Sequence, residues 1–371
     1  MKVLYIINSL GQGGAETIMT NIALSIKKKY KISILTLMPI DSKLTQQLQS
    51  NNIDIYCLNF VSFKLSVVGM FKMASIIRSN KPDIVHTFLG VSCLLGGIIA
   101  KVFSKSKIIW SIFYTNLDIK ENKLSTYIVI RFYILFSYLI PKYTIFDSTN
   151  SYDKHIKKSF NPNVSKVINN GVNTQEYKAS KETRINIRKR LGVDNCFVIG
   201  TFARYHPDKG YSLLLKVAKD LIEFDHILFI VSGIGVESSK FSKEIKQQKI
   251  TNIKIIKNDE IKIFELLNSI DLYLSPSMSE SFSLIICEAM SCEIPCLVTN
   301  VGDSAKIVGG NDMVVESNNS TDMSTKIRLY LDKPKNVKKT ISIQSRKRIA
   351  NHYNLEVMVG KYESLYNGNN Q

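Results

Sequence analysis

The feature that most constrains this chain is a repeated alternation of short apolar runs with longer segments of helical length. Short Val/Ile-rich runs separated by helical patterns predict βαβ units and a parallel sheet. In the first half we expect strands at residues 3–8, 32–37, 53–58, 84–88, 108–112, 144–146 and 166–168. A second series follows the turn at 169–173, with strands at 197–203, 227–232, 253–256, 272–275, 296–299 and 313–315.

Each series opens afresh, and the two are of comparable length. A chain of 371 residues is long for one domain, and one sheet containing all these strands would exceed the usual size of a domain. The pattern therefore favours an α/β protein with two doubly wound Rossmann-like domains facing a cleft. We place the first domain at 1–175 and the second at 176–352, and we expect a C-terminal helix in 353–371 to pack back toward the first domain.

Composition excludes several classes of protein. Apolar residues make up 45% and charged residues 22%, which is ordinary globular usage and excludes a disordered chain, a fibre or a disulfide mini-scaffold. The formal net charge is +18, and residues 1–175 carry most of the excess, with 21 basic and 8 acidic side chains. This balance permits either a nucleic-acid partner or an anionic membrane surface.

Cysteine usage and apolar run lengths bear on the compartment. The six cysteines form no CxxC pair, and no histidine lies near the group Cys287, Cys292 and Cys296, so we expect buried free thiols rather than a metal site. Unpaired cysteines suit a reducing cytosol. No uninterrupted apolar run reaches the roughly 18 residues of a membrane-spanning helix. We expect a cytoplasmic protein that can attach to the inner face of the cell membrane.

Cations and glycines follow two strands of the second series. Arg204 and Lys209 come just after the strand at 197–203, beside a Pro/Gly turn, and suit a diphosphate. Gly233 follows the next strand and would let a nucleotide approach the backbone. Each feature by itself is equally compatible with a solvated loop.

The segment 275–290 carries two carboxylates around a predicted helix start. Glu280 lies in the loop after a strand, and Glu288 lies about 7–8 Å along the helix that follows, at 1.5 Å per residue. Carboxylates accept hydrogen bonds from sugar hydroxyls, and a helix N-terminus binds a diphosphate. Two isolated glutamates would more often be unrelated surface and helix residues.

In the first half, Gly13 and Gly14 follow the first strand and open the first helix. Such a loop favours an anion at the helix N-terminus. It lacks the GxGxxG spacing, because position 16 is Glu, and it lacks the Gly-Lys-Ser/Thr of a P-loop. A tight βα turn without a ligand is the competing interpretation.

Taken in order, these blocks resemble the family-4 retaining glycosyltransferases of the GT-B fold. Glu280-x7-Glu288 followed by Ala-Met resembles the family signature, and Gly13-Gly14-Ala15-Glu16 resembles its first glycine loop. Further similar blocks are Asp83-Ile84-Val85-His86, Ile168-Asn169-Asn170-Gly171-Val172-Asn173 and Arg204 with Lys209-Gly210. The resemblance spans nearly the whole chain.

The resemblance implies a role for each matching residue. Arg204 and Lys209 would neutralise the departing diphosphate, Glu280 would hold the donor sugar, and Glu288 would hold the ribose. His86 would lie on the acceptor side near the reacting sugar, although a buried structural histidine is the alternative. Phosphate contacts would come from backbone N–H groups at Phe282, Ser283 and Leu284, with Gly14 across the cleft.

Two positions depart from the family pattern. Ser281 and Ser283 replace the glycines of Glu-Gly-Phe-Gly. Serine suits a helix N-cap but would not accept backbone angles that glycine alone adopts readily. Phe113 stands where the family often has an arginine, so an acceptor-side cation is missing. An inactive relative is one reading of these changes.

The implied reaction is hexosyl transfer from a nucleotide-diphosphate sugar with retention at the anomeric carbon. We favour a UDP-sugar over a GDP-sugar as donor, and the lack of an Asp-x-Asp motif predicts no metal and no other cofactor. The basic first half, with a candidate interfacial helix in 61–78, suggests a glycan acceptor linked to polyprenyl diphosphate, used in cell-surface polysaccharide synthesis. The alternatives are a sugar-nucleotide epimerase of the same fold and a basic nucleic-acid- or membrane-binding protein without catalysis. No nucleic-acid-binding motif is present.

Overall fold

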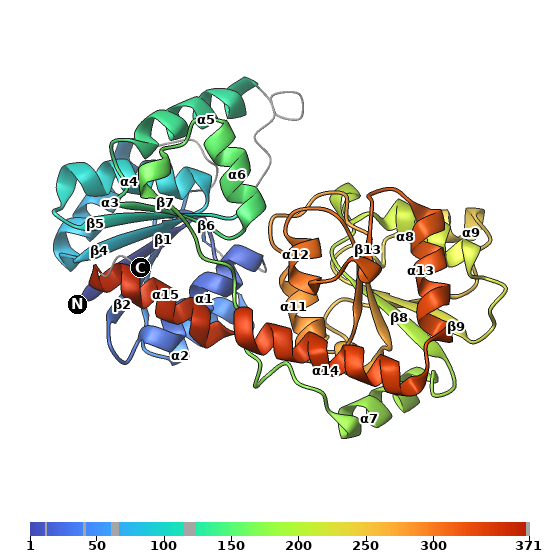
Figure 1. The fold of residues 1–371 in the computed structure, drawn as a ribbon. Coiled ribbons are helices and arrows are strands. Elements are labelled where there is room, and N and C mark those ends of the chain that lie inside the picture. Colours follow the sequence, from blue (N-terminus) through green and yellow to red (C-terminus); the bar gives the residue numbers. More distant parts are fainter. Residues whose placement is uncertain (12, 40–41, 61–66, 115–123, 369–371) are drawn as a thin grey trace. The chain divides into compact units, whose positions relative to one another are not determined.

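The computed structural model describes residues 1–371 except 12, 40–41, 61–66, 115–123 and 369–371. The chain divides into two compact units (Figure 1). Unit 1 comprises Met1–Asn170 together with Glu356–Gln371, and unit 2 comprises Gly171–Leu355. The end of the chain thus belongs to the same unit as its beginning.

Unit 1 is built on a seven-stranded sheet in the order β3-β2-β1-β4-β5-β6-β7, and its neighbouring strands are parallel. The order reverses between β1 and β4, which is the switch point of a doubly wound sheet. The strands are β1 (Lys2–Ile7), β2 (Lys31–Thr36), β3 (Asp54–Cys57), β4 (Ile84–Phe88), β5 (Lys107–Ile112), β6 (Tyr143–Phe146) and β7 (Ser165–Val167).

Helices cover both faces of this sheet. Leu4 and Ile6 of β1 pack into one buried cluster with side chains of α3, α4 and α5. Tyr5 points to the opposite face, where its ring hydroxyl meets Tyr366 of α15. The helices are α1 (Gly14–Ile26), α2 (Lys43–Ser50), α3 (Val67–Asn80), α4 (Gly90–Phe103), α5 (Leu124–Ser137), α6 (Thr149–Lys157) and α15 (Leu355–Asn367), with a 3₁₀ turn at Pro162–Val164.

Unit 2 repeats the plan with six strands in the order β10-β9-β8-β11-β12-β13, again parallel. Its order reverses between β8 and β11. The strands are β8 (Phe197–Phe202), β9 (Ile227–Ser232), β10 (Ile253–Ile256), β11 (Leu272–Ser275), β12 (Cys296–Thr299) and β13 (Val314–Val315). In both units every strand begins and ends within one residue of its predicted run, so the two-sheet fold predicted from periodicity is confirmed.

Two apolar clusters, one on each face, form the core of unit 2. Phe202 and Ile230 pack with α7, α10 and α11, whereas Ile199 and Val231 pack with α8, α9 and α13. The helices are α7 (Lys181–Leu191), α8 (Tyr211–Asp220), α9 (Ser239–Gln247), α10 (Ile263–Ser269), α11 (Leu284–Ser291), α12 (Ser304–Val308), α13 (Ser320–Asp332) and α14 (Lys335–His352), with 3₁₀ turns at Pro207–Lys209 and Asn311–Met313.

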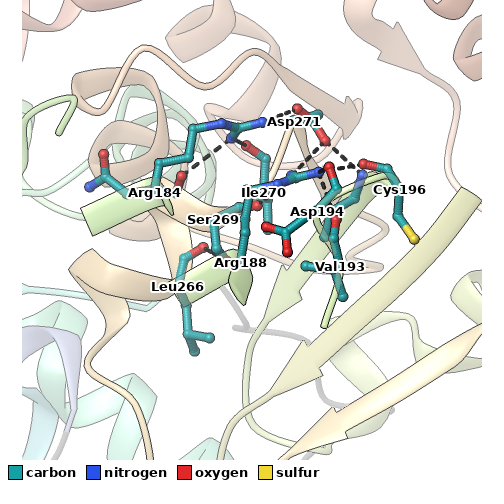
Figure 2. A network of polar contacts seen from close by, with 11 residues as sticks. Arg184, Arg188, Val193, Asp194, Cys196, Leu266, Ser269, Ile270 and Asp271 are labelled. Atoms are coloured by element: carbon teal, nitrogen blue, oxygen red, sulfur yellow. Dashed lines mark hydrogen bonds and ion pairs between the residues drawn. The ribbon is translucent and has the colours of Figure 1, made fainter. Parts of the chain in front are cut away.

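A polar clamp closes the amino end of the unit 2 sheet, and Figure 2 shows it. The Asp271 carboxylate, just before β11, accepts from Arg184 at 2.5 Å, from Arg188 at 3.1 Å and from the Val198 backbone N–H at 2.8 Å. Arg188 is 7% exposed, and its guanidinium also donates to backbone carbonyls, including those of Ser269 and Cys196. The clamp ties α7 to the starts of β8 and β11, at the edge of the sheet away from the ligand-binding edge of such folds.

The six cysteines are free thiols, and four of them are buried. Cys287, Cys292 and Cys296 belong to the apolar cluster that contains Phe202. Within the described part of the chain, no helix combines the length and the apolar character that crossing a bilayer requires.

Candidate functional site

The candidate site of unit 2 lies where β8 and β11 end, at the switch point of the sheet. Ligands of open α/β sheets bind at the carboxyl ends of the strands beside such a reversal. Arg204 follows β8, Gly233 follows β9, and Glu280 follows β11. The sheet order therefore brings together three predicted site residues that are far apart in the sequence.

An ion pair between Lys209 and Glu280 is the central contact of this site. The Lys209 Nζ lies 2.6 Å from Glu280 Oε1, and the two side chains are 21% and 10% exposed. The Ser277 hydroxyl donates to the same carboxylate oxygen at 2.9 Å. Charge-assisted bonds of this kind are short and directional, so the Glu280 carboxylate is fixed, and its second oxygen has no hydrogen bond or ion pair with the residues that the structure describes.

Backbone contacts hold the two loops that carry this pair. The Asp208 carbonyl accepts from the N–H groups of Met278 at 2.7 Å and Ser279 at 3.3 Å. Gly210 has φ +66, and a side chain there would collide with the Pro276 carbonyl. Only glycine adopts this conformation without strain and lets the loops approach so closely, which accounts for the Lys-Gly pair in the sequence.

Arg204 differs from Lys209 in its surroundings. It is exposed, and it has no hydrogen bond or ion pair with any residue in the described ranges. The preceding residue is fixed, because the Tyr211 hydroxyl donates to the Ala203 carbonyl at 2.5 Å. Arg204 thus has an unpaired side chain among the described residues, and the backbone next to it is held by a hydrogen bond.

Gly233 follows β9 with φ +139 and packs against the backbone of Ala203 and Arg204. Its lack of a side chain lets the loops after β8 and β9 touch. The structure therefore gives Gly233 a role in bringing the backbone near Arg204 into position.

The N-terminus of α11 faces the same edge of the sheet. Ser283 is its N-cap and makes no side-chain capping bond, with φ −99 and ψ 101. Ser281 also lies outside the positive-φ region. Neither serine therefore adopts a backbone conformation that favours glycine, and the effect of the two substitutions on phosphate binding stays a prediction. The Phe282 ring is 8% exposed and packs on Tyr353 at 5.7 Å between ring centroids, so this side chain is used by the core. The backbone N–H groups of Phe282, Ser283 and Leu284 are the groups that suit an anion here.

Glu288, in the second turn of α11, has a partner that sequence reasoning missed. The Tyr177 side chain lies close enough to interact with its carboxylate, and Glu176 lies close enough to act on its charge. Burial, together with the Glu176 charge, raises the pKa of Glu288 to about 7, and the interaction with Tyr177 opposes this shift. Tyr177 was not identifiable from motif spacing, because it follows the turn at 169–173 without a pattern of its own.

Tyr177 is itself held in place from two sides. The Ser291 hydroxyl donates to its carbonyl at 2.5 Å, and Arg346 of α14 donates to the same carbonyl at 3.2 Å. Arg346 also donates to the Thr174 carbonyl at 3.2 Å. The segment after Gly171 is thereby fastened beside Glu288.

In unit 1, the glycine loop lies at the end of β1, beside that unit's switch point. Gly13 is the N-cap of α1, and Gly14 is its first residue. The Glu16 side chain folds back so that its carboxylate lies against Gly13, and burial raises its pKa. The anion position at this helix start is thus approached by a carboxylate of the chain itself.

His86 is buried, which favours the structural histidine that the sequence left as the alternative. It is 0% exposed in the middle of β4. Its Nδ1 lies 2.6 Å from the Tyr366 hydroxyl and its Nε2 lies 2.8 Å from the Ser111 hydroxyl. Burial lowers its pKa to about 3, so it stays neutral. Through these contacts His86 links β4 to Tyr366 of α15 and to Ser111 of β5, and its role on the acceptor side stays a prediction.

Comparison with known proteins identifies the family of the chain. The family model "Glycosyl transferases group 1" matches residues 183–348, and "Glycosyl transferase 4-like" matches residues 2–148. The chain belongs to the family-4 GT-B glycosyltransferases. Both units of the glycosyltransferase are therefore accounted for by family models.

Characterised relatives of the glycosyltransferase cover most of its length. It is 24% identical over 346 residues to the UDP-Gal:alpha-D-GlcNAc-diphosphoundecaprenol alpha-1,3-galactosyltransferase of Escherichia coli, covering 88% of this chain and 86% of that one. It is 23% identical to the capsular polysaccharide biosynthesis glycosyltransferase CapM of Staphylococcus aureus, covering 81% and 80%. The crystal structure of Anabaena HepE in complex with UDP-glucose shares the fold, with a TM-score of 0.85, 19% identity and coverage of 99% and 100%.

Proposed function

We propose that this glycosyltransferase moves a hexose from a UDP-sugar to a glycan linked to polyprenyl diphosphate, with retention at the anomeric carbon and without a metal. The observation that carries the proposal is the Lys209–Glu280 ion pair beside the free cation Arg204 at the switch point of unit 2. The pair joins a cation suited to a diphosphate with a carboxylate suited to sugar hydroxyls.

The chemistry of the step determines what these residues do. The bond between the anomeric carbon and the diphosphate oxygen breaks, an acceptor oxygen bonds to the same carbon, and the proton of the acceptor hydroxyl passes to the departing diphosphate. Negative charge develops on the departing diphosphate, where Arg204, Lys209 and the N–H groups at the start of α11 would stabilise it. Such preorganised groups supply much of the rate enhancement when they face developing charge.

Donor and acceptor are inferred from the relatives. The Escherichia coli relative is named for UDP-Gal and a diphosphoundecaprenol-linked acceptor, and HepE was crystallised with UDP-glucose. Glu288 supports a nucleoside donor, because its carboxylate could accept from ribose hydroxyls. We propose that the reaction serves cell-surface polysaccharide synthesis at the cytoplasmic face of the membrane.

The first test is donor binding followed by transfer. We expect UDP-glucose, UDP-galactose or UDP-N-acetylglucosamine to raise the melting temperature more than GDP-mannose, because ligands stabilise the state that binds them. Transfer is then measured onto undecaprenyl-diphosphate-linked N-acetylglucosamine, with and without EDTA, and proton NMR gives the product's anomeric configuration. An inverted product, activity abolished by EDTA, or no stabilisation by any UDP-sugar would contradict the proposal.

The same assay separates transfer from epimerisation. A sugar-nucleotide epimerase would release UDP or a changed sugar without acceptor, whereas the proposed transferase releases UDP in proportion to acceptor glycosylated. Equal UDP release with and without acceptor is the outcome that would favour the epimerase.

A further inference from the structure

Unit 1 exposes an unusual amount of apolar surface on one layer of helices. Of the nineteen large apolar side chains exposed in the described chain, ten lie on α3, on α4, or on α5 and the turn after it. These helices pack side by side (Figure 1), with α4 in contact with both α3 and α5. All three contribute side chains to the same buried cluster. Exposed apolar patches of this extent mark an interaction surface.

On α5 the outward positions follow helical spacing. Phe132 is 50% exposed, Leu135 is 56% exposed, and Leu139, in the turn after the helix, is 60% exposed. Tyr133, on the inward side, is 1% exposed and stacks on Trp110. The helix therefore has apolar side chains on both its inner and its outer side, and only those on the inner side pack in the core.

The neighbouring helices continue this surface. On α3, Val67, Val68 and Phe71 are 67%, 77% and 68% exposed. On α4, Leu94 and Ile98 are partly exposed, and Val102 is 67% exposed. We call the outer surface of α3, α4 and α5 the basic apolar face.

The charges on this face have a single sign. The segments 67–80, 90–103 and 124–137 contain no Asp or Glu. Their only charged side chains are Lys72, Arg78, Lys101 and Arg131, all of which are exposed. Arg78 lies over the Phe103 ring at 4.9 Å and so links α3 to α4.

Exposed apolar side chains together with charges of one sign indicate which kind of partner can cover the basic apolar face. A second copy of the chain docked by a two-fold axis would bring the same cations together with no carboxylate to pair with them. An anionic lipid surface instead accepts the apolar side chains into its interfacial region and pairs its headgroups with the lysines and arginines. We propose that the basic apolar face is the surface by which this enzyme docks on an anionic bilayer.

The inference deepens the proposed function, because a polyprenyl-linked acceptor lies in a membrane. It also widens the sequence prediction, which placed an interfacial helix at 61–78. Residues 61–66 lie outside the described chain. The described structure adds α4 and α5 as further parts of the surface.

The test is flotation of the full chain with vesicles of phosphatidylglycerol and phosphatidylcholine, or of phosphatidylcholine alone, at low and high salt. Wild-type protein should bind the anionic vesicles, and high salt should weaken binding. The triple variant Phe132→Ser, Leu135→Ser, Leu139→Ser should bind at least about tenfold more weakly. The double variant Lys72→Gln, Lys101→Gln should lose more than about tenfold on anionic vesicles alone.

A matched control uses three apolar side chains of unit 2 with similar exposure. Ile185, Leu329 and Ile343 are 55%, 59% and 49% exposed, and their triple serine variant should bind vesicles like wild type. Stabilisation by UDP-glucose should be the same in all variants, which shows that they fold and keeps this test separate from that of the proposed function. Failure of wild type to bind anionic vesicles, equal losses in both triple variants, or a dimer in light scattering that the α5 variant alone dissociates would overturn the proposal.

Discussion

At the scale of single residues, Arg204 and Lys209 are both suited to a diphosphate, but only Lys209 also pairs with a carboxylate of the protein. Arg204 has no partner in the described chain, so Arg204→Ala should lower turnover by about 10²–10³ and leave the melting temperature unchanged. Lys209 also holds Glu280 at 2.6 Å, so Lys209→Ala should lower turnover at least as much and weaken donor-sugar selectivity. Steady-state kinetics with UDP-sugars and thermal melts measure both effects. Near-normal turnover of both variants would contradict the assignment.

Glu288 gives the site a pH dependence. Its pKa is raised from the ordinary value of 4.5 to about 7, so its carboxylate ionises only as pH rises through that range. If the ionised form binds ribose, affinity for UDP-glucose should fall about tenfold from about pH 8 to about pH 6. Calorimetric titration measures this, and Glu288→Gln is the control whose affinity should be lower and nearly independent of pH. A wild-type affinity that does not change over this range would contradict the role.

The same shift has the opposite sign for stability. Because the folded carboxyl binds a proton more tightly than the unfolded one, folding is favoured at low pH, and this contribution is lost as pH rises from about 4.5 to about 7. Donor binding and stability should therefore change in opposite directions with pH at this residue.

At the scale of elements, α15 is held to unit 1 by a buried polar chain. The Tyr366 hydroxyl contacts His86 at 2.6 Å and Tyr5 at 3.1 Å. Tyr366→Phe leaves both groups buried without this partner and should lower the free energy of unfolding by about 1–3 kcal/mol. Urea titration measures the loss, and Tyr138→Phe, at a 54% exposed position of the same unit, should change nothing. Equal stability of the two variants would show that the chain of hydrogen bonds adds nothing.

The clamp at the start of β11 allows a buried arginine and an exposed arginine of the same helix to be compared. Arg188→Ala removes a nearly buried cation from Asp271 and several carbonyls, and should destabilise unit 2 by about 3–5 kcal/mol. Arg190→Ala, two residues along the same helix, removes an exposed cation 3.7 Å from Glu260 and should cost under about 0.5 kcal/mol. Denaturant unfolding monitored by far-UV circular dichroism distinguishes the two variants. A loss below about 1 kcal/mol for Arg188→Ala would show that the clamp is dispensable.

At the scale of the whole molecule, the two units repeat one plan. Each has a parallel sheet whose order reverses once, at β1/β4 in unit 1 and at β8/β11 in unit 2. In each, a glycine-containing loop follows the first strand beside that reversal. The loops after β8 and β11 carry the Lys209–Glu280 pair, and the loop after β1 carries Gly13 with Glu16 against it.

Much of this was predictable from the sequence because its signals are local. Strand runs, turn chemistry and the order of motifs depend on neighbours in the chain, so the strands and the residues Arg204, Lys209, Gly233, Glu280 and Glu288 could be placed on their elements. Individual contacts were less accessible. The pattern at Asp83–His86 suggested a residue near the sugar, yet nothing local shows that Tyr366, 280 positions away, closes over His86.

The sequence by itself determined two parallel-sheet units, their strands, and the family to which the chain belongs, because periodicity and motif order are properties of short segments. Only the tertiary structure decided which groups meet: Lys209 with Glu280, Tyr177 with Glu288, and α15 with β1 and β4. It also showed that the outer side of α5 is left uncovered, since an apolar run looks the same in a sequence whichever of its sides the core takes. The physical reason is that burial and pairing depend on residues far apart in the chain.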